Sequence, residues 1–413
     1  MYALRAVLLT ALALFLSAPA LHAQESGPAQ GLGTAQELGT VLELSTDMLR
    51  FDQPSSRLFL GWHRDLNAML QAGLDGSEDL LAFHGQGKGL QRLGLLAVFA
   101  AADAVASRAF SLTAHDAAHM EAAFAIGASR AYLVHTSDPS VEMSVGEFFL
   151  EAFDPFIEPG LYTYTTSFIP TPQQAAAVAE EGLDTNLVIA ASISAEIADG
   201  NGHVLDLAPY ALNKLWGIGY FMDSGPTSDA AEYLFDLGLQ GFGVTAKSVI
   251  ALQAASFLAS GGFLALARSV ADFAMDDRSR VRPLALHLGE VQIFWPEVTT
   301  WLNPDAVSVQ LSTRVRWGAA LVSWAGIDVP ALGAGGAPEL TLGSWIRVGA
   351  VRLEGEITDR AFAFPFLRGS AELRVGRGAS IGVEGFYGRG FTMRERREYP
   401  MGPGASAFLR TRL

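Results

Sequence analysis

Cysteine is missing from the sequence, and its absence excludes several kinds of chemistry. None of the 413 residues can form a disulfide, hold zinc as a thiolate or act as a thiol nucleophile. Lysine is scarce too, because only Lys88, Lys214 and Lys247 occur, so a covalent mechanism through a lysine amine has few candidates.

The chain also lacks the motifs of common nucleotide-binding proteins and serine hydrolases. It has no G-x-S-x-G elbow, no Walker loop and no G-x-G-x-x-G motif after an expected strand. Charged residues make up only 17% of the chain and the net charge is -15, so a nucleic acid, itself a polyanion, is not the expected partner. What remains is a chain that is 50% hydrophobic and suited to apolar surroundings.

The first 23 residues have the pattern of a secretory signal peptide. Arg5 precedes an apolar run over residues 6–16, and small residues follow at Ala18, Ala20 and Ala23, where cleavage is expected. The run is too short for a membrane anchor. We therefore expect residues 1–23 to be removed on export, and an exported chain without cysteine suggests a bacterial envelope protein.

Charge and hydrophobic period both change near Arg278. The first 277 residues carry a net charge of -20, whereas the chain from Arg278 onward carries +5, with 17 arginines and no lysine. The hydrophobic period changes at the same place from about 3.6 residues to two. These changes predict a helical domain over residues 24–277 and an antiparallel β domain over residues 278–413.

Alanine and leucine dominate the first domain in segments with helical spacing. Thr113 and Ser228 are expected N-caps, and Thr171-Pro172 places a proline in a first helical turn. The expected helices include residues 36–51, 90–110, 113–133, 171–199 and 228–239. Residues 248–267 are long and apolar enough to span a membrane, although Gln253 and Ser256 dilute them and favour a buried helix.

Strict alternation predicts strands with one apolar and one polar face in the second domain. In residues 307–317 the odd positions hold valine, leucine, tryptophan and one threonine, while the even positions hold serine, glutamine and arginine. Similar alternation recurs over residues 351–357, 372–375, 380–387 and 406–413.

This second domain resembles the small β-barrels of bacterial outer membranes. It has room for about eight strands, ends on an amphipathic strand and carries arginines and glutamates that could fill a barrel lumen. It departs from those proteins in ending on Leu413 rather than on an aromatic residue. The resemblance implies an outer-membrane location with membrane lipid as a partner. A soluble β-sandwich, whose strands also alternate, is the alternative.

One helical segment contains a candidate metal site. His115 and His119 are four residues apart, which places both imidazoles on the same face of a helix. The stretch HDAAHMEAAFAIG over residues 115–127 resembles the zinc helix of the HExxH metallopeptidases. That resemblance implies zinc as the cofactor, His115 and His119 as ligands, and a peptide or protein as the substrate.

The same stretch departs from the HExxH motif at the catalytic base. Asp116 stands where the family has glutamate, and its side chain is one methylene shorter, so it would be a weakened base for a metal-bound water. Catalytic zinc also needs a third protein ligand. By analogy with the same peptidases, Glu196 on a later helix is the first candidate and Glu180 or Glu181 the second.

The sequence thus predicts an α+β multidomain protein, with an N-terminal all-α domain and a C-terminal antiparallel β-barrel of about eight strands. The predicted function is that of an exported envelope protein, a zinc-dependent hydrolase or peptidase-like protein anchored in the outer membrane. One alternative is a non-catalytic outer-membrane structural or binding protein. Another is a periplasmic protein, or an inner-membrane helical protein that uses residues 248–267 as a span.

Overall fold

The fold is known from a computed structural model, which describes residues 41–45, 56–85, 87–154, 160–222, 225, 228–318, 320–334, 338–360, 366–375, 379–387 and 403–412. The expected signal peptide, residues 1–23, lies outside the described residues. The helices are α2 (Ser56–Leu81), α3 (Gly89–Ala125), α4 (Val145–Ala152), α5 (Pro172–Asp199), α6 (Leu207–Met222), α7 (Asp229–Leu239), α8 (Ala246–Ala259) and α9 (Gly261–Asp276), with the 3-10 helix η3 (Val204–Asp206) before α6.

The strands fall into two groups. The first four are β1 (Val41–Ser45), β2 (Arg130–His135), β3 (Asp138–Met143) and β4 (Gly160–Thr165). The C-terminal part holds β5 (Ala285–Leu288), β6 (Val291–Phe294), β7 (Glu297–Asn303), β8 (Ala306–Trp317), β9 (Leu321–Gly333), β10 (Glu339–Val348), β11 (Val351–Arg360), β12 (Phe366–Val375), β13 (Ala379–Tyr387) and β14 (Pro403–Arg412).

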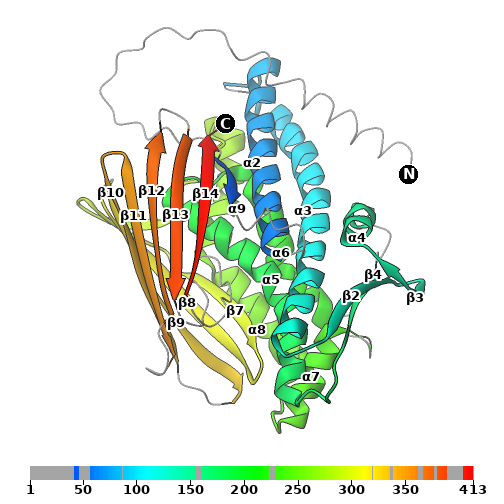
Figure 1. The fold of residues 1–413 in the computed structure, drawn as a ribbon. Coiled ribbons are helices and arrows are strands. Elements are labelled where there is room, and N and C mark those ends of the chain that lie inside the picture. Colours follow the sequence, from blue (N-terminus) through cyan, green and yellow to red (C-terminus); the bar gives the residue numbers. More distant parts are fainter. Residues whose placement is uncertain are drawn as a thin grey trace.

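A large antiparallel sheet, a layer of helices and a small second sheet lie side by side (Figure 1). The large sheet has 11 strands in the order β1-β14-β13-β12-β11-β10-β9-β8-β6-β5, and β7 also pairs with β8. The small sheet, β3-β2-β4, lies on the far side of the helices. The α+β class is therefore confirmed, and the C-terminal part has ten strands rather than about eight. The hydrogen-bonded order runs from β1 to β5 without joining these two ends among the described strands, so closure into a barrel stays a prediction.

Strands also occur where only helices were predicted. Residues 41–45, inside an expected helix, form β1, which pairs antiparallel with β14 and so belongs to the sheet of the other half. Pairing with the free edge of a sheet outweighs a weak helical pattern in so short a segment. The small sheet lies within residues 130–165, where valines, threonines and tyrosines favour strands.

The predicted helix ends are partly confirmed. The side chains of Thr171 and Ser228 cap α5 and α7, each accepting a hydrogen bond at 3.2 Å from the backbone N–H three residues later. The predicted N-cap at Thr113 is wrong, because residues 90–125 lie within one continuous helix. Thr113 instead donates its hydroxyl proton to the carbonyl of Ala109 at 2.8 Å.

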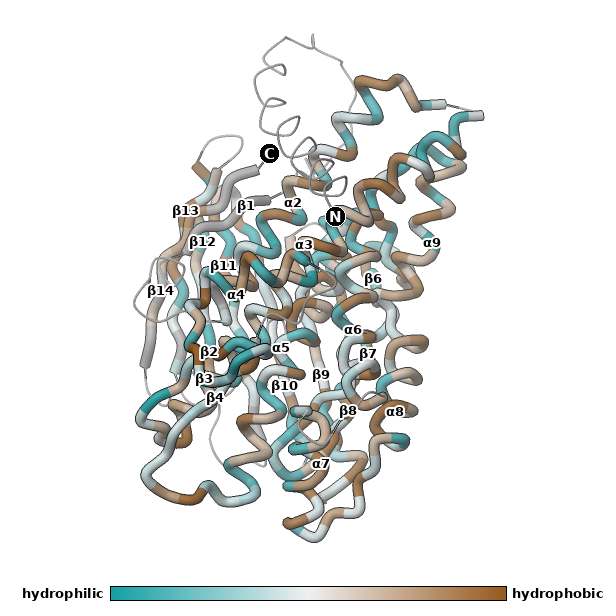
Figure 2. Tube along the Cα trace, turned by 90° about the vertical axis from the view of Figure 1, so that its right-hand side faces the viewer, coloured by the Kyte–Doolittle hydropathy of each residue, from teal (hydrophilic) through white to brown (hydrophobic). Residues whose placement is uncertain are grey.

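Two apolar helical segments have the composition of membrane spans. Among the described helices, α3 alone is long and apolar enough by itself to cross a membrane, judged by length and composition. Residues 248–267 instead belong to two helices, α8 and α9, which are bent by 52°. The hydroxyls of Ser256 and Thr300 lie 2.6 Å apart and tie α8 to β7. Polar and apolar residues alternate over short distances along much of the trace (Figure 2).

Arginines on β8 join the polar face of the large sheet to the helices. Arg314 forms an ion pair with Asp199 of α5 at 3.0 Å, and Arg316 donates to the carbonyl of Ala198 at 2.7 Å. Farther along the same face, Arg352 pairs with Glu354 at 2.8 Å. The arginines and carboxylates that were expected to fill a lumen therefore pair partly with each other and partly with the helical layer.

Candidate metal centre

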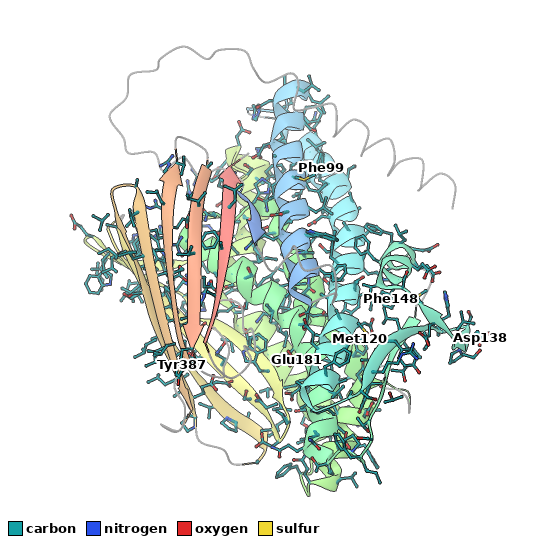
Figure 3. The ribbon with its side chains drawn as sticks, in the orientation of Figure 1. Phe99, Met120, Asp138, Phe148, Glu181 and Tyr387 are labelled. Atoms are coloured by element: carbon teal, nitrogen blue, oxygen red, sulfur yellow. The ribbon has the colours of Figure 1, made fainter. Side chains whose placement is uncertain are left out.

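The histidine pair lies in the most enclosed stretch of α3. All residues from Ser111 to Met120 are buried. Small side chains at Ala114, Ala117 and Ala118 leave room for neighbouring elements on several sides of the helix. Figure 3 labels Met120 on α3 and Glu181 on α5, which mark the level at which these two helices pass each other beside the histidines.

A third donor reaches the two imidazoles from α7. The Nε2 atoms of His115 and His119 are 3.1 Å apart, and Oδ2 of Asp229 lies 3.2 Å from each of them. The three atoms form a nearly equilateral triangle. Ligand atoms held tetrahedrally about 2.0–2.1 Å from zinc are about 3.3–3.4 Å apart, so a small expansion of the triangle would seat the ion. In the part of the chain that the structure describes, these residues are the one group with three donors close enough to hold a metal.

Asp229 is the first residue of α7, and its surroundings favour the ionised carboxylate. It directly follows the N-cap Ser228, where the helix dipole favours a negative charge. Burial raises the pKa of Asp229, but the charge of His119 and hydrogen bonds from both histidines outweigh burial and hold the pKa well below its usual range. The carboxylate is therefore in the state that a metal ligand requires.

Two further carboxylates follow Asp229 along α7. Burial and the charge of Asp229 raise the pKa of Glu232. Burial and the charge of Glu232 raise the pKa of Asp236 to about 6. Negative charge therefore accumulates beside the three donors, which favours a bound cation.

The backbone of α5 orients one imidazole. Nδ1 of His119 lies 2.5 Å from the carbonyl oxygen of Val178, and in the neutral ring this nitrogen donates its proton to that oxygen. Nε2, which donates a proton to Asp229 in the metal-free protein, would lose that proton and point at the ion once a metal is bound, which is the usual arrangement for a metal-binding histidine. Nδ1 of His115 is buried and has no hydrogen-bond partner among the described residues.

Aromatic rings and one glycine pack against the imidazoles. Tyr162 of β4 stacks on His119 with ring centres 4.0 Å apart, and Tyr220 of α6 stacks on His115 at 5.3 Å. Gly182 of α5 lies against His119 so closely that a Cβ there would be 2.1 Å from Nε2. These contacts restrict both rings to the orientation in which their Nε2 atoms meet.

The donor set suits zinc. Two imidazole nitrogens and one carboxylate oxygen are a common set of protein ligands in catalytic zinc sites, which leave a fourth position for water or substrate. The orientation of His119 by the Val178 carbonyl and the ionised state of Asp229 both fit this chemistry.

The predicted third ligand, Glu196, is not among the three donors that lie together. Glu196 lies 14 residues beyond Gly182 on the same helix, about 21 Å along its axis at 1.5 Å per residue. Its carboxylate accepts a hydrogen bond from the side chain of Asn201 at 2.8 Å, near the end of α5. Glu180 and Glu181 lie in the turn of α5 that passes His119, but Asp229 supplies the carboxylate in the group that could hold a metal.

Asp116, the predicted base, lies in the same buried turn as His115 and His119. It directly follows His115, and its side chain is 6% exposed. One residue corresponds to about 100° around the helix, so its side chain leaves α3 on a different side from the histidine pair. Its role as a base stays a prediction.

Sequence reasoning missed Asp229. This residue is 114 positions from His115, and an aspartate directly after an N-cap has an ordinary explanation in helix capping. No local pattern could have connected it to the histidines.

Comparison of the chain with models of protein families, with curated proteins and with solved structures finds no match. The functional assignment therefore rests on the geometry of the site.

Proposed function

We propose that the protein is a zinc-dependent hydrolase of the bacterial envelope, with His115, His119 and Asp229 as its zinc ligands. The observation that carries the proposal is the triangle of donor atoms, with edges of 3.1 and 3.2 Å. Three protein ligands leave a fourth position, which is typical of catalytic rather than structural zinc. The resemblance of residues 115–127 to the HExxH zinc helix makes a peptide or protein the proposed substrate.

Each residue near the site has a task in this proposal. Bound zinc would polarise a substrate carbonyl and acidify a bound water. Val178 and Tyr162 keep His119 in its ligand orientation, and Asp229 contributes the negative charge that balances part of the metal charge. Asp116 would accept the proton of the attacking water, and its short side chain would make hydrolysis slow.

Zinc content tests the ligand set. We expect about one zinc per chain in the wild type, close to none in the double variant His115→Ala, His119→Ala, and strongly reduced zinc in Asp229→Asn. Glu196→Gln is the matched control, because the sequence predicts Glu196 as a ligand and this residue lies about 21 Å along α5 from Gly182, which packs against His119. Unchanged zinc in Asp229→Asn, or loss of zinc in Glu196→Gln, would contradict the assignment.

A non-catalytic role for the zinc is the second candidate. The deep burial of the two imidazoles, which are 1% and 0% exposed, favours it because a substrate must reach the fourth position. Zinc would then tie α3 to α7 and raise the thermal midpoint without any reaction. A fluorogenic peptide library separates the two: zinc-dependent cleavage that Asp116→Asn weakens supports the hydrolase, and a stabilising zinc without cleavage supports the structural role.

We also propose that the large sheet anchors the protein in lipid of the outer membrane. Apolar side chains cover the outward face of β8–β14, with exposed fractions between 37% and 66% at positions such as Leu311, Ile346, Leu353, Leu373 and Val383. No charged residue occupies an outward position of these strands where the structure describes the side chain. The charged residues of the same strands lie on the opposite face, where Arg314 and Arg316 of β8 reach α5.

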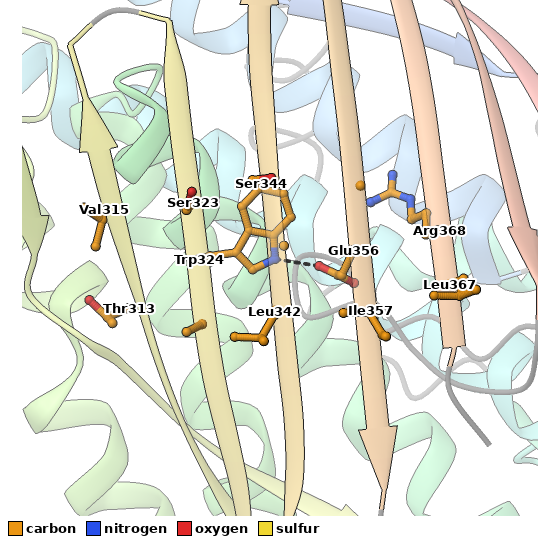
Figure 4. Close-up of a pocket in the computed structure, with 13 residues that line it drawn as sticks. Thr313, Val315, Ser323, Trp324, Leu342, Ser344, Glu356, Ile357, Leu367 and Arg368 are labelled. Atoms are coloured by element: carbon orange, nitrogen blue, oxygen red, sulfur yellow. Dashed lines mark hydrogen bonds between the residues drawn. The ribbon is translucent and has the colours of Figure 1, made fainter. Parts of the chain in front are cut away.

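The dimensions of this face favour a bilayer as its occupant. Leu340 and Val348 lie about 27 Å apart along β10, and seven strands span about 34 Å. A transmembrane barrel has an apolar band about 25 Å tall, whereas soluble proteins rarely expose such a large apolar patch. A shallow depression of about 720 Å³ opens on this face; its lining includes small residues such as Ser323 and Ser344 as well as the buried Glu356 and Arg368 (Figure 4). Anchoring needs only this face, so it does not depend on closure of the predicted barrel.

Because the chain has no cysteine, single labels test the lipid contact cleanly. Spin labels at Leu353→Cys and Val383→Cys should be accessible to dissolved oxygen and protected from a water-soluble nickel complex in vesicles. Phe235→Cys is the control, since this residue of α7 is apolar and 64% exposed but lies outside the sheet. Equal access of nickel to all three labels would contradict the anchor, as would labels on the sheet that are shielded from both reagents by a second copy.

A further inference from the structure

A second buried polar cluster lies between α2, α3 and η3, separate from the metal centre. It consists of His63, Asn67 and Gln71 on α2, Asp103 and Ser107 on α3, and Asp206 in η3, each at most 7% exposed. The three α2 residues follow one another at a spacing of four, so they share one face of the helix. The cluster therefore belongs to the packed contact between α2 and α3.

Asp206 receives most of the hydrogen-bond donors in this cluster. One of its oxygens accepts from the side chains of Asn67 and Gln71, each at 2.7 Å, and the other accepts from the backbone N–H of His203 at 2.7 Å. Three donors stabilise a carboxylate in its charged form. Burial raises the pKa of Asp206, but the hydrogen bonds from His203 and Asn67 oppose this rise, so of the two carboxylates Asp206 is the one that holds the negative charge.

Asp103 is poorly supplied with donors. Among the described residues its side chain has one contact, a weak one: the hydroxyl of Ser107 donates to Oδ1 of Asp103 at 3.4 Å. Its Oδ2 is buried without a hydrogen-bond partner in the described part of the chain, and so is Oδ1 of Asn67. The cluster thus contains two buried acceptor atoms for which no hydrogen-bond donor is present among the described residues. A proton on Asp103 would supply one.

Within the described part of the chain, no cation in this contact compensates a charge on Asp103. His63 lies 2.8 Å from Ser107, but burial lowers its pKa to about 4, so the ring is neutral at pH 7. Burial and the charge of Asp206 raise the pKa of Asp103 well above its usual range. Other charged or titratable groups also face this contact or pack beside it: Asp75 and Glu78 of α2, Arg92 of α3, His203, Asp272 of α9 and Arg280. Arg92 forms an ion pair with Glu78 at 2.5 Å.

We propose that Asp103 is a buried proton-binding site, and that loss of its proton at alkaline pH loosens α2 from α3. With the proton in place, Asp103, Ser107 and His63 form a neutral chain beside the charged Asp206. Without it, two carboxylates share a buried cluster that has donors for only one, and separation of the helices lets water solvate the second. The contact between α2 and α3 is thus a pH-sensitive switch.

Infrared spectroscopy of the full-length protein tests the proton. At pH 8 the wild type should show the C=O stretching band of a protonated carboxyl, and Asp103→Asn should remove it. Asp206→Asn is the matched variant: it should keep a band that titrates at lower pH, because the neighbouring charge is gone. A wild type without the band, or a band that survives Asp103→Asn in folded protein, would overturn the proposal.

Hydrogen exchange tests the switch itself. Backbone amides of α2 should exchange faster in the wild type as the pH rises through the midpoint of the infrared band, after correction for the intrinsic pH dependence of exchange. Asp103→Asn mimics the protonated form in shape and charge, so it should keep the slow rate at every pH. Exchange of α2 that follows the same corrected course in both proteins would refute the switch, and zinc content should be equal in both.

Discussion

Gly182 controls how closely α5 approaches the proposed zinc ligands. A Cβ at this position would lie 2.1 Å from Nε2 of His119 and 2.6 Å from two of its ring carbons, which is too close for any side chain. The approach lets the carbonyl of Val178 in the same helix reach Nδ1 of the same ring. One missing side chain thus places both the ring and its hydrogen-bond partner.

Gly182→Ala should therefore move the His119 ring and lower the zinc affinity about 10–100-fold, the usual cost of disturbing the support of a metal ligand. Competition with a chelator of known affinity measures this change. Gly219→Ala is the control, because a Cβ on that residue of α6 meets nothing within 4 Å. Equal affinities in the two variants would exclude a role for the close approach.

Asp236 makes stability depend on pH in a defined direction. Its pKa is raised by burial and by Glu232 to about 6, compared with about 3.9 in an unfolded chain. Between these values the folded protein binds more protons than the unfolded chain, so the contribution to stability is largest at low pH and falls as the pH rises through 6.

We expect Asp236→Asn to remove this penalty and to raise the unfolding free energy by about 1 kcal/mol at pH 8 after allowance for solvent screening. At pH 4 the two proteins should differ much less, because Asp236 is then largely protonated when folded. Thermal midpoints at the two pH values measure the effect. A difference that is the same at both values would show that charge on Asp236 is not its cause.

At the scale of elements, each strand of the large sheet separates two environments. On β10, Leu342 points outward and is 46% exposed, while its neighbour Thr341 points inward, is 2% exposed and shares a hydrogen bond of 3.0 Å with Thr358. Because the period of a strand is two, every second side chain is on the buried face of the sheet and every other one meets the surroundings. A charge should therefore have opposite consequences on the two faces.

Leu342→Arg should destabilise the protein in a bilayer by about 2–4 kcal/mol, the cost of an arginine on the lipid face of a transmembrane sheet. Leu80→Arg is the control, since Leu80 of α2 is 86% exposed and lies away from the sheet; we expect a change within about 0.5 kcal/mol there. Denaturant unfolding in lipid vesicles measures both. An unchanged unfolding free energy in Leu342→Arg would show that this face lies in water.

The ion pair of Arg314 with Asp199 connects β8 to α5. Its atoms are 3.0 Å apart, and the two side chains are 12% and 4% exposed. Removal of one member leaves a charge that is largely buried, so Arg314→Met should cost about 3 kcal/mol. The double variant with Asp199→Asn should recover most of this loss, and a double-mutant cycle on thermal midpoints shows the coupling. Strictly additive effects of the two substitutions on the thermal midpoint would mean that the ion pair does not stabilise the contact between β8 and α5.

At the scale of the whole molecule, the helical and strand halves are interdependent. Helix α9 ends at Asp276 and β5 begins at Ala285, so the change from helices to strands follows the predicted boundary. Yet β1 from the first half pairs with β14 along five residue pairs, and β7 from the second half packs on α5 and α8. Each half therefore covers part of the surface of the other.

Residues 24–277 and 278–413, expressed separately, should each fail to fold, because each would expose the surface that the other covers. Expression of the two pieces together should restore a complex that resists limited proteolysis and binds zinc. The intact chain under the same conditions is the control. Independent folding of the first piece with full zinc binding would show that the helical half is a separate domain.

Several features could be predicted because they depend on neighbours in the sequence. The caps at Thr171 and Ser228, the strand over residues 307–317 and the shared face of His115 and His119 all follow from local spacing. The strand at residues 41–45 could not be predicted in the same way, since its partner is β14 at the other end of the chain.

The third metal donor shows the same division. The position of Glu196 along α5 keeps it away from the histidines, whereas Asp229 reaches them because α7 packs against α5. Local free energies decide whether a segment becomes a helix or a strand, and which of its faces is polar. Contacts between distant segments decide which polar groups meet. The sequence by itself therefore determined most of the helices, the alternating strands of the second half and the histidine pair, and only the tertiary structure decided the third donor, the order of the sheet and the polar cluster between α2 and α3.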